Sequence, residues 1–272
     1  MRLKRLWVHI PIVAILIFVL GPLLLMLNNA LKPAGGLNDN PFHLPERLVW
    51  TNFSDAWVQG EYARAFGNSV LVGISCILII CVSAGLAAYA LAKLRFKGSN
   101  AVMGLLLFTM SIPLGLFLVP LFYLWQKFNL MDTLGGMILI YSAIFLPFSI
   151  FMLRAFLVKI PNELIESAKI DGCSETMVLL KMIVPIAKSA FMTLAVLVSL
   201  WTWNEFFFAN AFLISDETRT VATRYLAFSG RYSSDWTLIS AAGVITTAPI
   251  LILYLLLQRR FVEGLVEGSV KG

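Results

Sequence analysis

Glu205 has the most unusual surroundings of any carboxylate in the sequence, because it lies inside a long apolar run from about Ser189 to Leu213. A charged side chain in such a run is unfavourable in lipid and usually faces a cavity or a partner. Its neighbours are Trp203, a broad ring, and Asn204, which both donates and accepts hydrogen bonds. These three residues are candidates for a path taken by a polar solute. The residues alone are equally consistent with another arrangement, in which Asn204 and Glu205 hydrogen-bond neighbouring helices or lie near the outer interface.

A second group of candidate residues lies in the polar stretch from Arg154 to Lys188. Pro161 suits the first turn of a helix, where no backbone N–H is needed, and Glu163 and Glu166 then lie near the positive end of the helix dipole. Gly172 supplies a turn that other residues resist. The pattern predicts a short helix, a glycine turn and a second short helix. Its apolar face, which a partner groove would accept, consists of Leu164, Ile165 and Ala168.

The composition indicates that these elements belong to a membrane protein. Hydrophobic residues make up 59% of the 272 residues and charged residues only 13%, whereas a soluble domain typically carries about 25% charged residues. One helical crossing of a bilayer needs about 20 apolar residues, and the chain contains several runs of this length. The sequence therefore predicts an all-α polytopic membrane protein with about six transmembrane helices and a polar loop that protrudes from the membrane.

The expected crossings divide one membrane domain, residues 1–272, into three parts. Residues 1–66 hold the first helix and an outer loop, 67–257 form the core with the protruding loop 154–188, and 258–272 form a tail. Proline inside a crossing indicates either a simple packing kink or an interrupted helix beside a cavity. The crossings are expected at about Val8–Leu27, Asn68–Ala92, Ala101–Trp125, Gly136–Leu153, Ser189–Leu213 and Leu238–Leu257.

The basic residues set the expected orientation. Fourteen of the 21 Lys and Arg residues fall on the side of the two termini and the 154–188 loop, and seven fall on the other side. The richer side is expected to be cytoplasmic. The first apolar run also fits a cleaved signal peptide, but it is long for one and no clear A-x-A site follows, so an uncleaved helix is expected.

Several other functions lack their sequence signals. The net charge of +6 comes from basic residues that flank apolar runs, which argues against nucleic acid as a partner. The three cysteines and two histidines form no metal-binding spacing, and no hydrolase or protease motif is present, so no catalytic or metal-binding residue is predicted. An ion-coupled carrier is an open alternative, although such proteins usually place several ionisable groups in the membrane. A receptor or scaffold is another.

The protruding loop resembles the coupling loop of permease subunits in ATP-binding-cassette (ABC) importers. The family pattern is E-A-A, three residues, Gly, nine residues, then I-x-L-P. Its register is matched by Glu166-Ser167-Ala168, Gly172, Met182, Val184 and Pro185, although the residue types at 167, 182 and 184 differ mildly from the pattern. The resemblance implies that the loop docks on an ATPase subunit. The residues implied in this coupling are Glu163, Glu166, Ser167, Ala168, Asp171 and Gly172.

The resemblance extends over nearly the whole chain and points to the maltose-type branch of carbohydrate importers, in particular to its shorter permease. Trp203-Asn204-Glu205-Phe206 resembles the W-N-E-F segment of that branch, and Gln258 to Gly272 resembles its tail, which reaches into the ATPase dimer. Tail contacts are accordingly implied for Gly268, Lys271 and Gly272.

The resemblance also implies the partners and the mechanism. A second homologous permease, two ATP-binding subunits and an extracytoplasmic solute-binding protein are expected in a bacterial inner membrane, with lipid around the helices. The chain has no G-x-x-x-x-G-K-[ST] motif, so no cofactor is expected on it and the partner subunits are expected to hydrolyse ATP. Alternating access for a sugar or a sugar-like solute follows from the resemblance alone.

Overall fold

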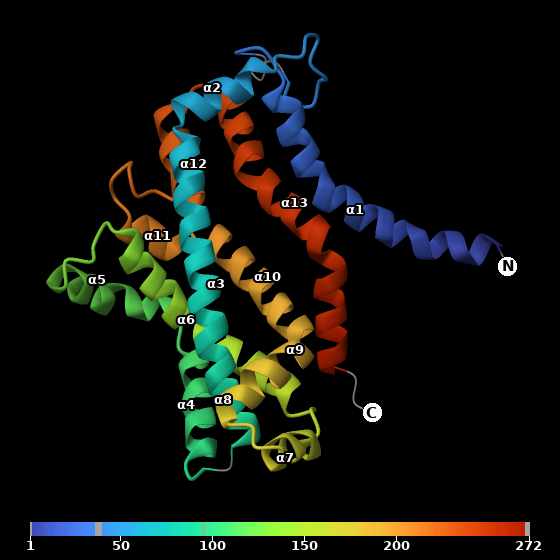
Figure 1. The fold of residues 1–272 in the computed structure, drawn as a ribbon. Coiled ribbons are helices and arrows are strands. Elements are labelled where there is room, and N and C mark those ends of the chain that lie inside the picture. Colours follow the sequence, from blue (N-terminus) through green and yellow to red (C-terminus); the bar gives the residue numbers. More distant parts are fainter. Residues whose placement is uncertain (1, 36–39, 95, 270–272) are drawn as a thin grey trace. The chain divides into compact units, whose positions relative to one another are not determined.

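The computed structural model describes residues 2–35, 40–94 and 96–269, with the backbone alone for 2–8 and 259–269. All regular secondary structure in these residues is helical (Figure 1), which confirms the predicted fold class. The helices are α1 (Arg2–Ala30), α2 (Thr51–Gln59), α3 (Tyr62–Lys93), α4 (Ser99–Ser111), η1 (Leu114–Phe117), α5 (Leu118–Lys127), α6 (Leu134–Leu157), α7 (Asn162–Ile170), α8 (Glu175–Val178), η2 (Leu179–Ile183), α9 (Val184–Ile186), α10 (Lys188–Asn204), α11 (Phe207–Phe212), α12 (Val221–Arg231) and α13 (Trp236–Ser269).

Among the described residues, four helices are long and apolar enough to cross a membrane, and two bent helix pairs raise the number to six if each pair is one span. The four are α1, α3, α6 and α13, which contain the predicted first, second, fourth and sixth crossings. The bent pairs are α4 with η1–α5, and α8–α9 with α10.

The third crossing was predicted from about Ala101 to Trp125 with prolines inside it, and the structure has a broken helix pair there instead of one continuous helix. Helix α4 ends at Ser111, Ile112 is extended with ψ 127°, and the chain turns through 92° before it continues from Leu114. Pro113 explains the break, because proline lacks the N–H that the helix needs and pushes the preceding residue out of the helical region. The bend is far larger than a packing kink.

The fifth crossing was predicted as a helix from Ser189 to Leu213, and here too the helix is interrupted. Helix α10 ends at Asn204, Glu205 is extended with ψ 119°, and the short helix α11 follows. At its start, α10 forms a 78° bend with the segment Glu175–Ile186. Glu205 therefore lies in a break between two helices, where its side chain has backbone N–H groups nearby.

The chain forms two compact units. The first comprises residues 1–66 and 221–251, and the second comprises residues 67–220 and 252–272. In the first unit, Asn52 donates hydrogen bonds of 2.8 Å to the carbonyls of both Ala30 and Lys32, which fixes α2 against the end of α1. Also in this unit, the buried Arg224 of α12 donates to the carbonyl of Gly60 at the corner between α2 and α3.

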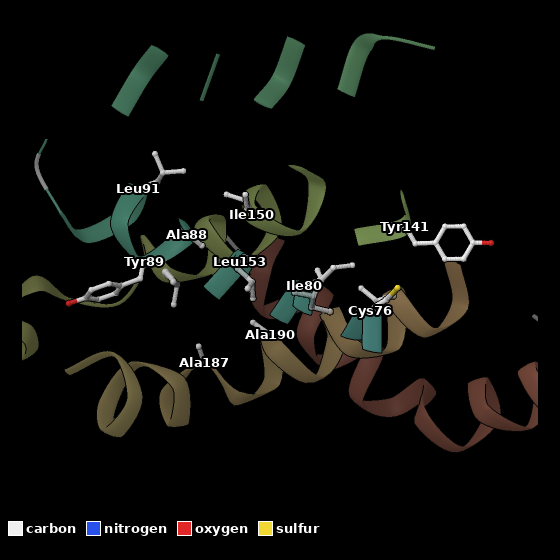
Figure 2. Packing of buried hydrophobic residues seen from close by; sticks show 14 of the residues in the cluster. Cys76, Ile80, Ala88, Tyr89, Leu91, Tyr141, Ile150, Leu153, Ala187 and Ala190 are labelled. Carbon is white, nitrogen blue, oxygen red and sulfur yellow. The ribbon is translucent and has the colours of Figure 1, made fainter. Parts of the chain in front are cut away.

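The core of the second unit is built around one stripe of α3. Five small or medium side chains at four-residue spacing are almost completely buried, and this spacing places them on one face of the helix. Figure 2 shows Tyr89 and Tyr141 at opposite ends of the cluster, with both hydroxyls pointing away from it. The stripe consists of Val72, Cys76, Ile80, Ala84 and Ala88.

Candidate functional site

The predicted coupling helix is present as α7, and its start follows the sequence pattern. Pro161 precedes the helix at the N-cap with φ −58°, and Asn162 is the first helical residue. Glu163 lies in the first turn, where its charge opposes the partial positive charge of the unpaired N–H groups.

The end of α7 is a Schellman turn centred on Gly172. The Cys173 N–H donates to the carbonyl of Ala168 at 2.9 Å, and the Gly172 N–H donates to the carbonyl of Lys169 at 3.0 Å. These two bonds satisfy carbonyls that the helix itself leaves free. Gly172 has φ +84°, in the left-handed region that glycine adopts without a Cβ penalty. The predicted role of Gly172 as a turn residue is thereby explained by its backbone.

The apolar face that the sequence predicts for α7 is divided between the chain's own core and the surface. Ile165 is buried and Ala168 packs half-buried against the core cluster, whereas Leu164 is exposed. Ile170, in the last turn, is the most open large apolar side chain of α7, at 86% exposure. The remaining predicted coupling residues are exposed side chains or backbone, namely Glu163, Glu166, Ser167, Asp171 and Gly172.

Two side chains at the end of α3 contact residues on either side of α7 in the sequence. Lys93 donates to the Ile160 carbonyl and, at 3.1 Å, to the side chain of Asn162. Tyr89 donates a 2.6 Å hydrogen bond to the carboxylate of Glu175. Neither Tyr89 nor Lys93 was predicted to have a role at this loop, since no local pattern indicates a contact across 86 residues.

Glu175 also closes the turn between α7 and α8. Its carboxylate forms an ion pair with Lys169 in the last turn of α7. Ser174, the residue before it, caps α8 by accepting the Met177 N–H at 3.3 Å. The turn is therefore held by a side-chain ion pair and a helix cap as well as by the backbone of Gly172.

The carboxylate of Glu205 is occupied by three internal hydrogen bonds. The hydroxyl of Tyr141 on α6 donates to Oε2 at 2.6 Å. The backbone N–H groups of Phe208 and Ala209 donate to Oε1 and Oε2 at 2.9 and 3.1 Å. Glu205 thus caps α11 and joins it to α6. A buried or half-buried carboxylate needs such donors, and the break in the helix supplies two of them.

The two other candidate path residues differ from Glu205 in their surroundings. Asn204 is exposed, although its amide donates to the carbonyl of Leu200 at 2.8 Å. Trp203 is half-buried. Trp201, which also suits stacking on a ring, instead packs against Phe145 and Phe148 with ring centroids 5.1 and 5.3 Å away. The structure thus brings the three predicted residues to one break but leaves Asn204 as the most open of them.

The segment after α11 is fixed by side chains from two distant positions. Asp132 accepts from the N–H groups of Ile214 and Ser215 at 2.8 and 3.1 Å. Partial burial by itself raises the pKa of Asp132, but hydrogen bonds from this segment, including one from Thr218, outweigh it and lower the pKa below the ordinary 3.8. Asn68, near the start of α3, donates to the carbonyls of Glu217 and Arg219.

The predicted tail contacts fall at the end of the described chain. Gly268 is in the last turn of α13, and Lys271 and Gly272 lie outside the described residues.

A family model described as "Binding-protein-dependent transport system inner membrane component" matches residues 80–266, the region that contains α7 and the Glu205 break. The chain belongs to this family. The predicted family and the permease function are confirmed, and the ion-coupled carrier, the alternative that the sequence left open, is set aside.

Curated relatives match the permease over most of its length. It is 35% identical over 94% of its length to the probable ABC transporter permease protein YurM of Bacillus subtilis, covering 85% of that protein. It is 32% identical over 92% of its length to the arabinooligosaccharides transport system permease protein AraQ of Halalkalibacterium halodurans, covering 91% of that protein. Such relatives are transport permeases, in agreement with a role other than catalysis.

A solved structure has the same fold. The chain superimposes with a TM-score of 0.81 on a chain of a bacterial ABC transporter involved in the import of the acidic polysaccharide alginate. The match covers 96% of the permease and 98% of that chain at 21% sequence identity. The chain therefore has the same fold as that transporter chain.

Proposed function

We propose that this permease and a second, homologous permease together form the membrane path for an oligosaccharide, and that separate ATPase subunits drive its alternating access. The sugar assignment is supported by the AraQ relative, whose name refers to arabinooligosaccharides, and by the W-N-E-F segment at Trp203 to Phe206. The energy must enter from a partner because the sequence carries no phosphate-binding loop.

The observation that carries the proposal is the outward face of α7. This helix is anchored to the body through Ile165 and Ala168, and it presents the exposed apolar Ile170 beside the acidic Glu166 and Asp171. An apolar side chain rimmed by charges is typical of a surface that a protein partner covers. The partner is proposed to be an ATP-binding subunit, two of which serve the permease pair.

The orientation follows from the position of this loop. ATP is available in the cytoplasm, so α7, the N-terminus and the tail from 258 to 272 are proposed to face the cytoplasm of a bacterial cell. The excess of Lys and Arg on the same side supports this assignment. Gly268, Lys271 and Gly272 then contact the ATPase dimer, and a solute-binding protein delivers the sugar on the opposite side.

The path itself is proposed to pass the break between α10 and α11. Asn204 and Trp203 are the residues of the break proposed to face the sugar. Glu205 contributes by keeping the break open, because its carboxylate is bonded to Tyr141 and to the N-terminal N–H groups of α11.

The test is co-purification of the complete transporter from mild detergent with Ile170→Asp. We expect the ATPase subunit to be lost and the second permease to be retained, because a charge replaces the exposed apolar contact of α7. Leu44→Asp is the matched control, since Leu44 is 83% exposed and lies far from α7 in sequence. Undiminished co-purification of the ATPase with Ile170→Asp rejects α7 as the docking site, and an unmodified chain that purifies without any ATPase rejects the proposed function.

A further inference from the structure

Helix α3 makes specific polar contacts at both ends of its stretch in the second unit, each with a segment far away in sequence. At one end Tyr89 and Lys93 contact residues on both sides of α7. At the other end Asn68 donates hydrogen bonds of 2.8 and 2.9 Å to the carbonyls of Glu217 and Arg219. Asn68 and Lys93 are 25 residues apart, which corresponds to about 37 Å of helix.

Between these ends α3 is packed as a rigid element. The stripe from Val72 to Ala88 is 0–1% exposed, and close-packed interiors transmit displacement because they compress little. Near the outer end of the stripe, Gly73 lies against Thr202 of α10, where an added Cβ would be 3.4 Å from the threonine hydroxyl. The helix is therefore in contact with the broken crossing as well as with both loops.

The two contacts that flank α7 in the sequence are charge-assisted hydrogen bonds. Tyr89 is 4% exposed, and a hydrogen bond from a buried hydroxyl to a carboxylate is charge-assisted and stronger than a neutral one. The carbonyl of Ile160 immediately precedes Pro161, and the cationic Lys93 donates to it. Because one contact lies before α7 and the other after it, a displacement of α7 either moves the end of α3 or breaks both contacts.

We propose that Tyr89 and Lys93 are positioning residues that transmit movement of α7 to α3, and that α3 carries this movement to the segment 214–219 through Asn68. This inference rests on the proposed function, in which α7 is the element that the ATPase moves. It adds a route by which the nucleotide state reaches the segment 214–219.

The experiment follows a label on the outer segment in the purified complete transporter. Ile214, which is 61% exposed, is replaced by cysteine, and its reaction rate with a polar maleimide is measured with and without MgATP and vanadate. The labelling rate of the chain that lacks the introduced cysteine is measured in the same way and subtracted as background. ATP hydrolysis and co-purification of the ATPase are measured on the same samples.

In the otherwise natural chain we expect the nucleotide to change the labelling rate. In Tyr89→Phe combined with Lys93→Met we expect this change to fall by about threefold or more, as loss of energetic coupling does, while the ATPase still co-purifies and hydrolyses ATP. With Lys93→Arg in place of Lys93→Met, part of the nucleotide-dependent change in labelling rate should return, because arginine keeps the charge and the donors. A subunit that is merely less stable would lose hydrolysis and labelling response together.

The control variants are Tyr123→Phe and Lys127→Met, exposed residues of α5 with the same chemical changes. They should leave the labelling response unchanged. An undiminished response in the Tyr89 and Lys93 variants overturns the inference and leaves the proposed function intact. A natural complex that hydrolyses ATP without any response at position 214 also overturns it, whereas absence of the ATPase from the complex is a failure of the proposed function.

Discussion

The loop around α7 and the break at Glu205 both concentrate polar residues, but they use them in opposite ways. Around α7, Glu163, Glu166 and Asp171 are exposed, and the backbone turn at Gly172 positions them. At the break, the carboxylate of Glu205 is turned inward and its oxygens are occupied by Tyr141 and α11. In this permease the exposed charges belong to the proposed partner surface, whereas the carboxylate with internal hydrogen bonds joins two helices.

The largest effect is expected from Gly172→Val, which attacks the geometry of the α7 loop. A β-branched residue resists φ +84°, and the left-handed conformation is disfavoured by roughly 1–2 kcal/mol even for ordinary residues. We expect ATP-driven uptake in proteoliposomes to fall about tenfold or more, because the turn that orients α7 is strained. Gly135→Ala, at an exposed position with open space around it, should change uptake little. Normal uptake by Gly172→Val would show that the turn does not position the docking surface.

A smaller effect, on stability, is expected from Glu205→Gln. The glutamine amide keeps one acceptor oxygen, but its NH₂ group faces a donor where the second carboxylate oxygen was. One of the three hydrogen bonds to the side chain is therefore lost, which lowers the free energy of unfolding by about 1–3 kcal/mol. Thermal unfolding in detergent should show a lower Tm, with the sugar concentration for half-maximal uptake unchanged. Tyr141→Phe should lower the Tm in the same direction, since it removes one of these donors. An unchanged Tm with an altered sugar dependence would instead place Glu205 in contact with the substrate.

The smallest effect concerns Asp132, which fixes the segment after α11. Its pKa is lower in the folded chain than its ordinary value of 3.8, so its contribution to stability is present above about pH 4 and is lost as the pH falls through the folded value. We therefore expect Asp132→Asn to lower the Tm at pH 6 and the difference from the natural chain to shrink below about pH 4. A difference that stays constant from pH 6 to pH 3 would show that the carboxylate charge is not what holds Ile214 and Ser215.

The α7 loop was accessible to sequence analysis because its signals are local. Pro161, Gly172 and Pro185 act through their own backbone conformation, and their spacing is preserved whatever the rest of the chain does. Similarly, the apolar runs of α1, α3, α6 and α13 follow from the length of chain that a bilayer requires. Even so, the division of the apolar face of α7 between core and surface was not predictable, since it depends on what packs beside Ile165 and Ala168.

The sequence by itself determined the membrane class, the family and the position of the glycine turn, because these depend on composition and on backbone chemistry at fixed spacings. Only the tertiary structure decided that Glu205 caps a helix break, that Asp132 and Asn68 hold the segment 214–219, and that Tyr89 and Lys93 contact residues on either side of α7. Apart from the two hydrogen bonds from Phe208 and Ala209 to Glu205, these contacts join residues between 64 and 151 positions apart. A hydrogen bond of this kind exists only when packing brings the donor within about 3 Å of its acceptor, and no local pattern records that distance.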